Sequence, residues 1–262
     1  MKAIRWKAHS ARLSASTRLG VVLFLFATTQ QQDAYGAAPP SLESYLENAG
    51  IAIEPAALSR VIRGDHILSG LAAQVAADRG MKTVVPALKE ALERSGRFPA
   101  LEASYGRALA VLGHSEVKPV LLKLVRAPGD DFLMKSDAAV GLAVLGDPSG
   151  FPSVERMLKG DEPSNGERLF RGISVLPYFV RFPNTGARET ILKLAEHEYL
   201  PVRRAMARAL GEHEGQDVRR LLDVFAESGD PDTASIARSG LERMRAREFE
   251  RKRPAFLKRK KP

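Results

Sequence analysis

The chain has 262 residues, of which 44% are hydrophobic and 6% aromatic, and it contains no cysteine. The lack of cysteine excludes a disulfide framework and any mechanism that needs a thiol nucleophile. The formal net charge of +9 comes from the two ends, because residues 37–242 carry a net charge of −3, and an acidic middle argues against a basic nucleic-acid groove.

Residues 1–36 have the layout of a secretory signal peptide. Five basic residues, from Lys2 to Arg18, precede an apolar run over 19–27, and the small residues Ala34 and Gly36 follow. We expect cleavage after Gly36 and an exported, periplasmic protein. The alternative is an uncleaved N-terminal anchor in the inner membrane, although the run falls short of the ~20 residues that a spanning helix needs.

Residues 37–64 are expected to form a linker and capping helices. Pro39 and Pro40 make a short stiff spacer, apolar residues at helical spacing predict a helix over 42–49, and a second short helix is expected over 55–62. These elements would cap the structure that follows, because the terminal unit of a repeat array needs a polar outer face.

A period of 33 residues organises the middle of the chain. Each period has an apolar segment with helical spacing, a glycine where a helix end tolerates a left-handed residue, and a proline early in the next segment. A repeat of this length indicates helical hairpins that stack on their neighbours. The glycines are Gly80, Gly113 and Gly146, and the prolines are Pro86, Pro119 and Pro152.

The clearest hairpin spans residues 138–158. Its run Leu142-Ala143-Val144-Leu145-Gly146-Asp147-Pro148, followed by an apolar helix with an early proline, resembles a HEAT-like repeat of the short bacterial kind, also found in bilin-lyase-related repeats. The resemblance covers residues 65–245 and implies an all-α fold, a right-handed α-α solenoid. It says little about function, because such repeats serve as scaffolds, adaptors and a few enzymes.

The repeat loosens but continues beyond residue 160. An irregular connection is expected between Pro177 and Gly186, and the last helix is expected over 232–248. Caps for helix starts are offered by Asp130 or Asp131, by Asp147, by Ser164 with Glu167, and by Asp230 before Pro231.

The residues typical of catalysis do not form a recognised constellation in this sequence. The tripeptides around His197 and His213, each Glu-His-Glu, could converge on a metal, but neighbouring residues of a helix point in different directions. A histidine near a helix C-terminus is also favoured by the helix dipole alone. We therefore expect no metal, no cofactor and no enzymatic activity; the alternative is an enzyme related to the HEAT-like lyases.

One basic position repeats along the second helices of the hairpins. Because such helices commonly line the concave face of a solenoid, the repeated cations predict a basic ladder that would bind an acidic peptide or other anion. The alternative is a solvated face on which Glu155, Glu189 and Glu196 balance the positive charge. The ladder residues are Lys123, Arg126, Arg156, Lys159 and Lys193.

Residues 246–262 form a basic C-terminal tail. Its cations could hold an anionic lipid or polysaccharide surface, or the tail could be solvated and disordered. They are Arg251, Lys252, Arg253, Lys258, Arg259, Lys260 and Lys261. The sequence thus predicts a non-catalytic scaffold or adaptor of the cell envelope whose partner is another protein, with an envelope-surface binder as the alternative and nucleic acid disfavoured.

Overall fold

The computed structural model describes residues 41–64, 68–129, 131–159 and 166–252, and within these ranges it contains thirteen α-helices, several short 3₁₀ segments and no strand. The all-α class expected from the sequence is confirmed. The signal peptide over 1–36 and the predicted cap at Ser164 lie outside the described residues.

Three successive hairpins keep the 33-residue period. In each, an inner helix ends at a glycine with positive φ, a 3₁₀ turn follows, and an outer helix begins with a proline in its first turn. Gly146, for example, has φ of 81°, and the Asp147 side chain then accepts a hydrogen bond from the Ser149 amide. The pairs are α4 (Ser69–Asp78) with α5 (Val85–Arg94), α6 (Pro99–Val111) with α7 (Lys118–Arg126), and α8 (Phe132–Val144) with α9 (Phe151–Leu158).

The ends of the array are less regular. Before the hairpins come α2 (Leu42–Asn48) and α3 (Pro55–Arg63), close to their expected bounds. After them the expected irregular connection is present as two 3₁₀ segments, Leu176–Phe179 and Pro183–Thr185. The remaining helices are α10 (Gly166–Val175), α11 (Ala187–Ala195), α12 (Leu200–Gly211), α13 (Gln216–Ala226) and α14 (Pro231–Lys252).

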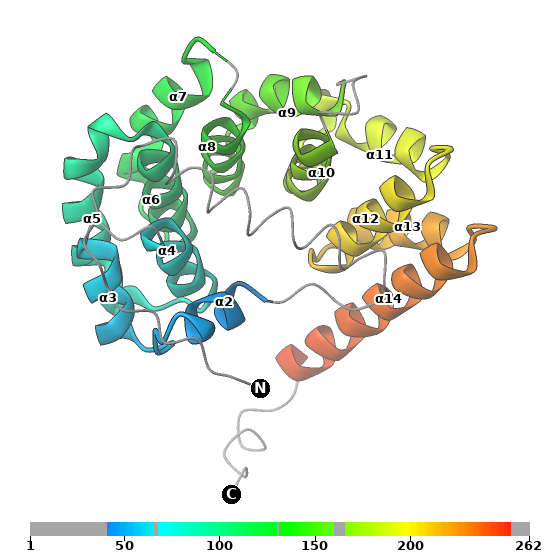
Figure 1. Cartoon of the computed structure of the whole chain (residues 1–262). Helices are drawn as coiled ribbons and strands as arrows, with labels where there is room; N and C mark the ends of the chain where they lie inside the picture. Colours follow the sequence, from blue (N-terminus) through cyan, green and yellow to red (C-terminus); the bar gives the residue numbers. More distant parts are fainter. Residues whose placement is uncertain (1–40, 65–67, 130, 160–165, 253–262) are drawn as a thin grey trace, which may run out of the picture.

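The helices lie in two rows that curve into an arc (Figure 1). Helices α4, α6, α8, α10 and α12 form the inner row, and α3, α5, α7, α9 and α11 form the outer row. Each inner helix contacts the next, and α14 packs against α12 and α13. The long helix α14 brings the C-terminal end of the arc back toward α2 (Figure 1).

This arrangement corrects the expectation that the second helices of the hairpins line the concave face. The second helices α5, α7, α9 and α11 lie on the outer row (Figure 1). The physical reason is side-chain size, because α4, α6 and α8 are rich in Ala and Gly and can approach closely. A Cβ at Gly141 of α8, for example, would stand only 3.2 Å from the Cα of Arg107 on α6.

The core runs between the two rows as one continuous cluster of buried side chains. Helix α8 is buried over the whole stretch 134–143, including three polar residues, Lys135, Ser136 and Asp137. Buried polar groups must be hydrogen-bonded to be tolerated, and α8 is therefore the place where polar contacts hold the array together.

Candidate functional site

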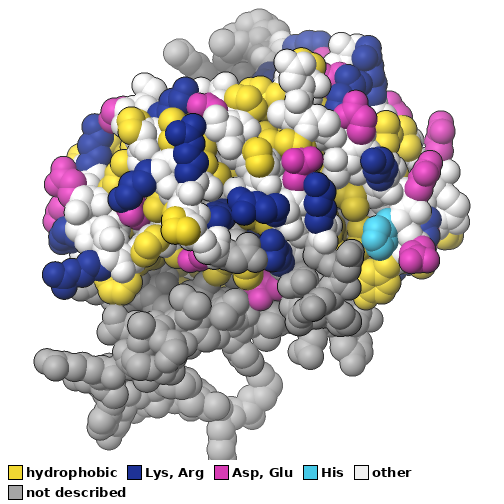
Figure 2. Space-filling model, turned by 90° about the horizontal axis from the view of Figure 1, so that it is seen from above, with side chains coloured by type: hydrophobic (Ala, Val, Ile, Leu, Met, Phe, Trp, Pro, Cys, Tyr) yellow, Lys and Arg dark blue, Asp and Glu magenta, His cyan; other side chains and the backbone are white. Residues whose placement is uncertain are grey.

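The five residues of the predicted basic ladder are all exposed on the outer row. Lys123 and Arg126 lie on α7, Arg156 lies on α9 with Lys159 directly after its end, and Lys193 lies on α11. Figure 2 looks down on the top of the arc and shows Lys and Arg side chains spread among hydrophobic and acidic ones. The structure thus places the ladder on the convex side of the arc rather than on its concave face.

The ladder cations are not neutralised by their expected acidic neighbours. Within the described residues, none of the five makes an ion pair, and neither do Glu155, Glu189 and Glu196. Arg156 makes a long contact of 3.4 Å with the Ser153 hydroxyl. The outer row therefore presents positive charges that are open to solvent and to a partner.

The first cations of the predicted tail belong to helix α14. Arg251 pairs with Glu214 at 2.7 Å and Lys252 pairs with Glu248 at 2.6 Å. Arg247 and Arg251 attach the last turns of α14 to the end of α12 and to Glu214 after it, whereas the Lys252–Glu248 pair lies within α14 itself. Arg253, Lys258, Arg259, Lys260 and Lys261 lie outside the described residues.

The two histidines considered as metal ligands have different surroundings. His197 accepts a hydrogen bond from the Tyr199 amide through Nδ1, whereas the His213 ring packs edge-on against Tyr178 with centroids 4.4 Å apart. Across the described ranges, no group of three or more His, Asp or Glu side chains is placed to hold a metal ion.

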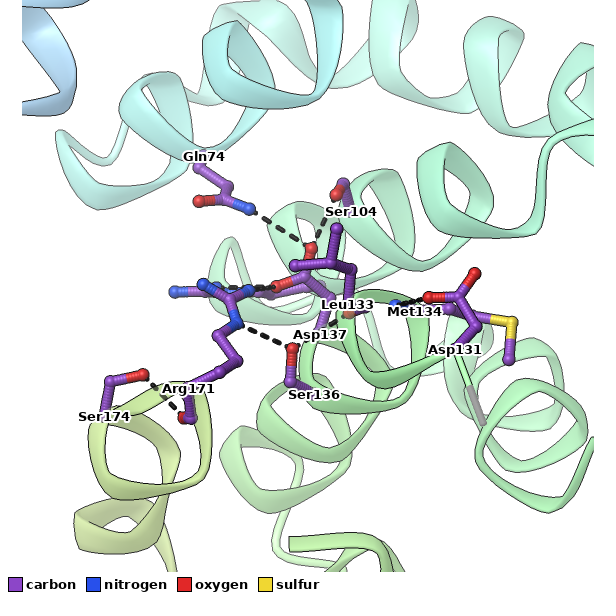
Figure 3. A network of polar contacts seen from close by, with 10 residues as sticks. Gln74, Ser104, Asp131, Leu133, Met134, Ser136, Asp137, Arg171 and Ser174 are labelled. Carbon is purple, nitrogen blue, oxygen red and sulfur yellow. Dashed lines mark hydrogen bonds and ion pairs between the residues drawn. The ribbon is translucent and has the colours of Figure 1, made fainter. Parts of the chain in front are cut away.

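The most connected polar residue is Asp137, near the middle of α8. Its Oδ1 accepts hydrogen bonds from Arg107 at 2.9 Å and from Arg171 at 2.6 Å. Its Oδ2 accepts from Ser104 at 2.6 Å and from Gln74 at 3.2 Å. Figure 3 shows Gln74 and Ser104 approaching this carboxylate from one side and Arg171 from the other. One carboxylate therefore joins four inner helices, α4, α6, α8 and α10.

The electrostatics of this network favour the ionised form of Asp137. Burial alone would raise its pKa, but the nearby guanidinium groups of Arg171 and Arg107, together with the Ser104 hydrogen bond, leave the pKa below its usual value. A carboxylate accepts about four hydrogen bonds, so Asp137 has no capacity for a further donor. Its role is to position helices.

The sequence analysis missed this network, although the sequence carries a signal for it. Ser104 and Asp137 are one 33-residue period apart, and so are Gln74 and Arg107. Polar residues stand here at positions of the period where an inner helix is expected to carry apolar residues. This departure from the pattern would have indicated a polar contact along the inner row.

A pocket of about 320 Å³ opens where the hairpin turns beyond α8, α10 and α12 meet. Its walls include Val144 at the end of α8, Tyr178 and Arg181 after α10, His213 after α12 and Gln216 at the start of α13. Burial is the first cause that lowers the pKa of His213 to about 4, followed by the charges of Arg247 and Arg107. His213 is thus neutral at neutral pH.

No family model matches the chain, and no curated protein matches it. None of the described helices combines the length and the apolar character that crossing a membrane requires. The function is therefore inferred from the residues and contacts of the chain itself.

Proposed function

We propose that this chain is a non-catalytic scaffold or adaptor that binds another protein through the outer row of a right-handed α-α solenoid of HEAT-like hairpins. The proposal is supported by the 33-residue register of the hairpins α4–α5, α6–α7 and α8–α9 and by the curved double row of helices. Stacked repeats of this kind present an extended surface that suits a protein partner.

The observation that carries the proposal is the repetition of one exposed cation along successive outer helices. Lys123, Arg156 and Lys193 occupy matching places on α7, α9 and α11, and within the described residues none of them is ion-paired. Charges on an exposed surface steer association and select partners of complementary charge. The partner is accordingly a protein with an acidic face.

The layout of residues 1–36 supports the proposal that this scaffold is exported to the cell envelope. Its basic start, apolar run and small residues are the layout of an export signal. Intact-mass measurement of the protein isolated from the envelope tests this part of the proposal. A mass that begins at Ala37 is expected, and recovery of the full-length chain in the cytoplasmic fraction, with none in the envelope, would refute it.

The binding proposal is tested by charge reversal on the outer row. We expect the triple variant Lys123→Glu, Arg156→Glu, Lys193→Glu to lose the partner that the unmodified chain captures in crosslinked envelope fractions. The matched control reverses three exposed cations elsewhere, Lys82, Arg97 and Arg245, and should keep the partner at the same yield. Equal capture by both triple variants would remove the outer row from consideration.

A chain that ends at Arg247 separates the repeats from the basic tail. It keeps the residue that fastens α14 to α12 and removes all seven predicted tail cations. Retention of the partner by this chain supports binding through the repeats. Loss of the partner, together with salt-sensitive binding of the full chain to anionic vesicles, would show that the tail acts on an anionic surface.

A further inference from the structure

The exposed cations of the outer row are bounded by carboxylates on both sides. Helices α5, α7, α9 and α11 follow one another along this row (Figure 1). At one repeated position, at or directly after the last turn of each helix, they carry Glu93, Arg126, Lys159 and Glu196, all of them exposed. The first three are 33 residues apart, and Glu196 stands three residues after Lys193, as Lys159 stands three after Arg156. The sign of the charge thus changes on either side of α7 and α9.

The cations of α7 and α9 belong to one surface, because the two helices touch. The Ser153 hydroxyl of α9 donates to the Val125 carbonyl of α7 at 3.5 Å. The Nη2 of Arg156 lies 3.4 Å from the same hydroxyl, and Arg126 directly follows Val125. Arg156 therefore lies where α9 meets the end of α7. We call the four cations of these two hairpins the central patch: Lys123, Arg126, Arg156 and Lys159.

The central patch keeps an excess of positive charge. Helix α7 contains no carboxylate, and α9 contains only Glu155, which is half-buried and makes no ion pair among the described residues. The carboxylates in the turns before the two helices are engaged elsewhere: Glu116 pairs with Lys89 at 2.9 Å, and Asp147 pairs with Lys118 at 3.0 Å. The patch therefore attracts negative charge from a partner.

The two flanking helices carry carboxylates that no cation balances. On α5, Glu93 makes no ion pair among the described residues, and the other charged residues of this helix are all ion-paired. On α11, the unpaired carboxylates of Glu189 and Glu196 stand about one turn on either side of Lys193, and the remaining cation of this helix is ion-paired to α13. Negative charge that extended beyond the central patch would be repelled there, and positive charge would be attracted.

We propose that the protein partner contacts the outer row with a short acidic segment that has basic residues on both sides; this inference rests on the protein-binding role proposed above. The acidic centre of the segment lies on the central patch, and its basic ends lie beside Glu93 and Glu196. Helices packed side by side are ~10 Å apart, so the row from α5 to α11 spans ~30 Å. An extended chain covers that length with about ten residues. A longer acidic run would meet the flanking carboxylates and bind less well.

Two synthetic ten-residue peptides test the proposal by calorimetric titration of the mature chain at low salt. Both have four glutamates at the centre; one has a serine and then two lysines on each side, and the other has only serines there. We expect the lysine-flanked peptide to bind about threefold tighter, because exposed pairs of opposite charge each add a little affinity. Attraction to the whole chain predicts the reverse, since residues 37–262 carry a net charge of +5 once the +4 of residues 1–36 is removed from +9. Equal affinities, tighter binding of the serine-flanked peptide, or no saturable binding of either would overturn the proposal.

Neutralising the central patch shows whether the peptides bind there. The double variant Arg126→Gln, Arg156→Gln should weaken the binding of both peptides about fivefold. The matched control Arg97→Gln, Arg245→Gln changes two exposed arginines elsewhere and should bind both peptides as the unmodified chain does. Equal thermal midpoints would show that the fold is intact. Unchanged affinities in the patch variant would remove the outer row as the binding surface, and the proposed function would fail together with this inference.

Neutralising the flanks tests the inference separately from the proposed function. The double variant Glu93→Gln, Glu196→Gln should remove the advantage of the lysine-flanked peptide and leave the serine-flanked peptide bound at least as tightly as before. An advantage that persists in this variant would show that the flanking carboxylates do not select the partner. If the patch variant still weakened both peptides, the outer row would remain the binding surface and only the basic flanks of the partner would be refuted.

Discussion

Ser104 donates a 2.6 Å hydrogen bond to Asp137 although the two residues occupy equivalent positions of successive repeats, 33 residues apart. Residues that are one sequence period apart therefore contact each other directly, across the adjacent inner helices α6 and α8. Arg107 lies three residues after Ser104 on the same face of α6 and binds the other oxygen of the same carboxylate. The inner row is therefore held in register by polar contacts as well as by the packing of small residues.

Replacing Asp137 with alanine should destabilise the protein by about 3–5 kcal/mol, because two largely buried guanidinium groups would lose their shared counter-ion. Urea unfolding followed by circular dichroism measures the change. Asp223 is exposed on α13 and has no partner among the described residues, so Asp223→Ala should stay within about 0.5 kcal/mol of the unmodified chain. Similar stability losses for both variants would contradict the role given to Asp137.

The sequence was sufficient to predict the helices and the turns that connect them. The 33-residue spacing of Gly80, Gly113 and Gly146 corresponds in the structure to three left-handed turns with the same 3₁₀ segment after each. Local chemistry fixes such features, because a positive φ and a cap depend on neighbouring residues only. The predicted cap at Asp131 is likewise present, accepting from the Met134 amide at 2.9 Å.

The sequence was insufficient to predict whether each helix lies on the inner or the outer row of the arc. Which row curves inward depends on how closely neighbouring helices can pack, and that depends on residues from different repeats, such as Gly141 of α8 against Arg107 of α6. The Asp137 network and the Tyr178–His213 contact have the same origin. Each joins residues at least 30 positions apart, which no local pattern specifies.

The close approach of the turn after α8 to that helix gives a steric prediction. A Cβ added at Gly150 would lie 2.6 Å from Cα of Ala139, a distance that backbone atoms cannot accommodate without moving. We expect Gly150→Ala to lower the free energy of unfolding by about 1–3 kcal/mol. At Gly96 the added carbon would meet nothing within 4 Å, and Gly96→Ala should be neutral or slightly stabilising. Thermal unfolding distinguishes the two, and equal midpoints would contradict the packing described here.

The buried imidazole of His213 makes stability depend on pH. Its pKa is about 4 in the folded chain and near 6.5 in its ordinary, unfolded environment. Between these pH values the imidazole is protonated in the unfolded state but not in the folded state. The contribution of His213 to the free energy of unfolding is therefore fully present above pH 6.5 and falls as the pH is lowered toward 4, by up to about 1.4 kcal/mol per pH unit. Urea midpoints measured across this window should show a shallower pH slope for His213→Gln. An identical slope in the variant would exclude His213 as the source.

Helix α14 is attached to the end of α12 by Arg247. Its Nη2 donates to the Gly211 carbonyl at 2.7 Å and its Nη1 to the Glu212 carbonyl at 3.2 Å, which satisfies backbone acceptors that a helix end leaves open. Arg247→Ala should therefore cost about 1–2 kcal/mol and speed amide exchange at the end of α12. Arg245, two residues earlier and exposed, has no partner among the described residues, and Arg245→Ala should change neither quantity. Equal exchange in both variants would show that Arg247 does not hold α14 against the end of α12.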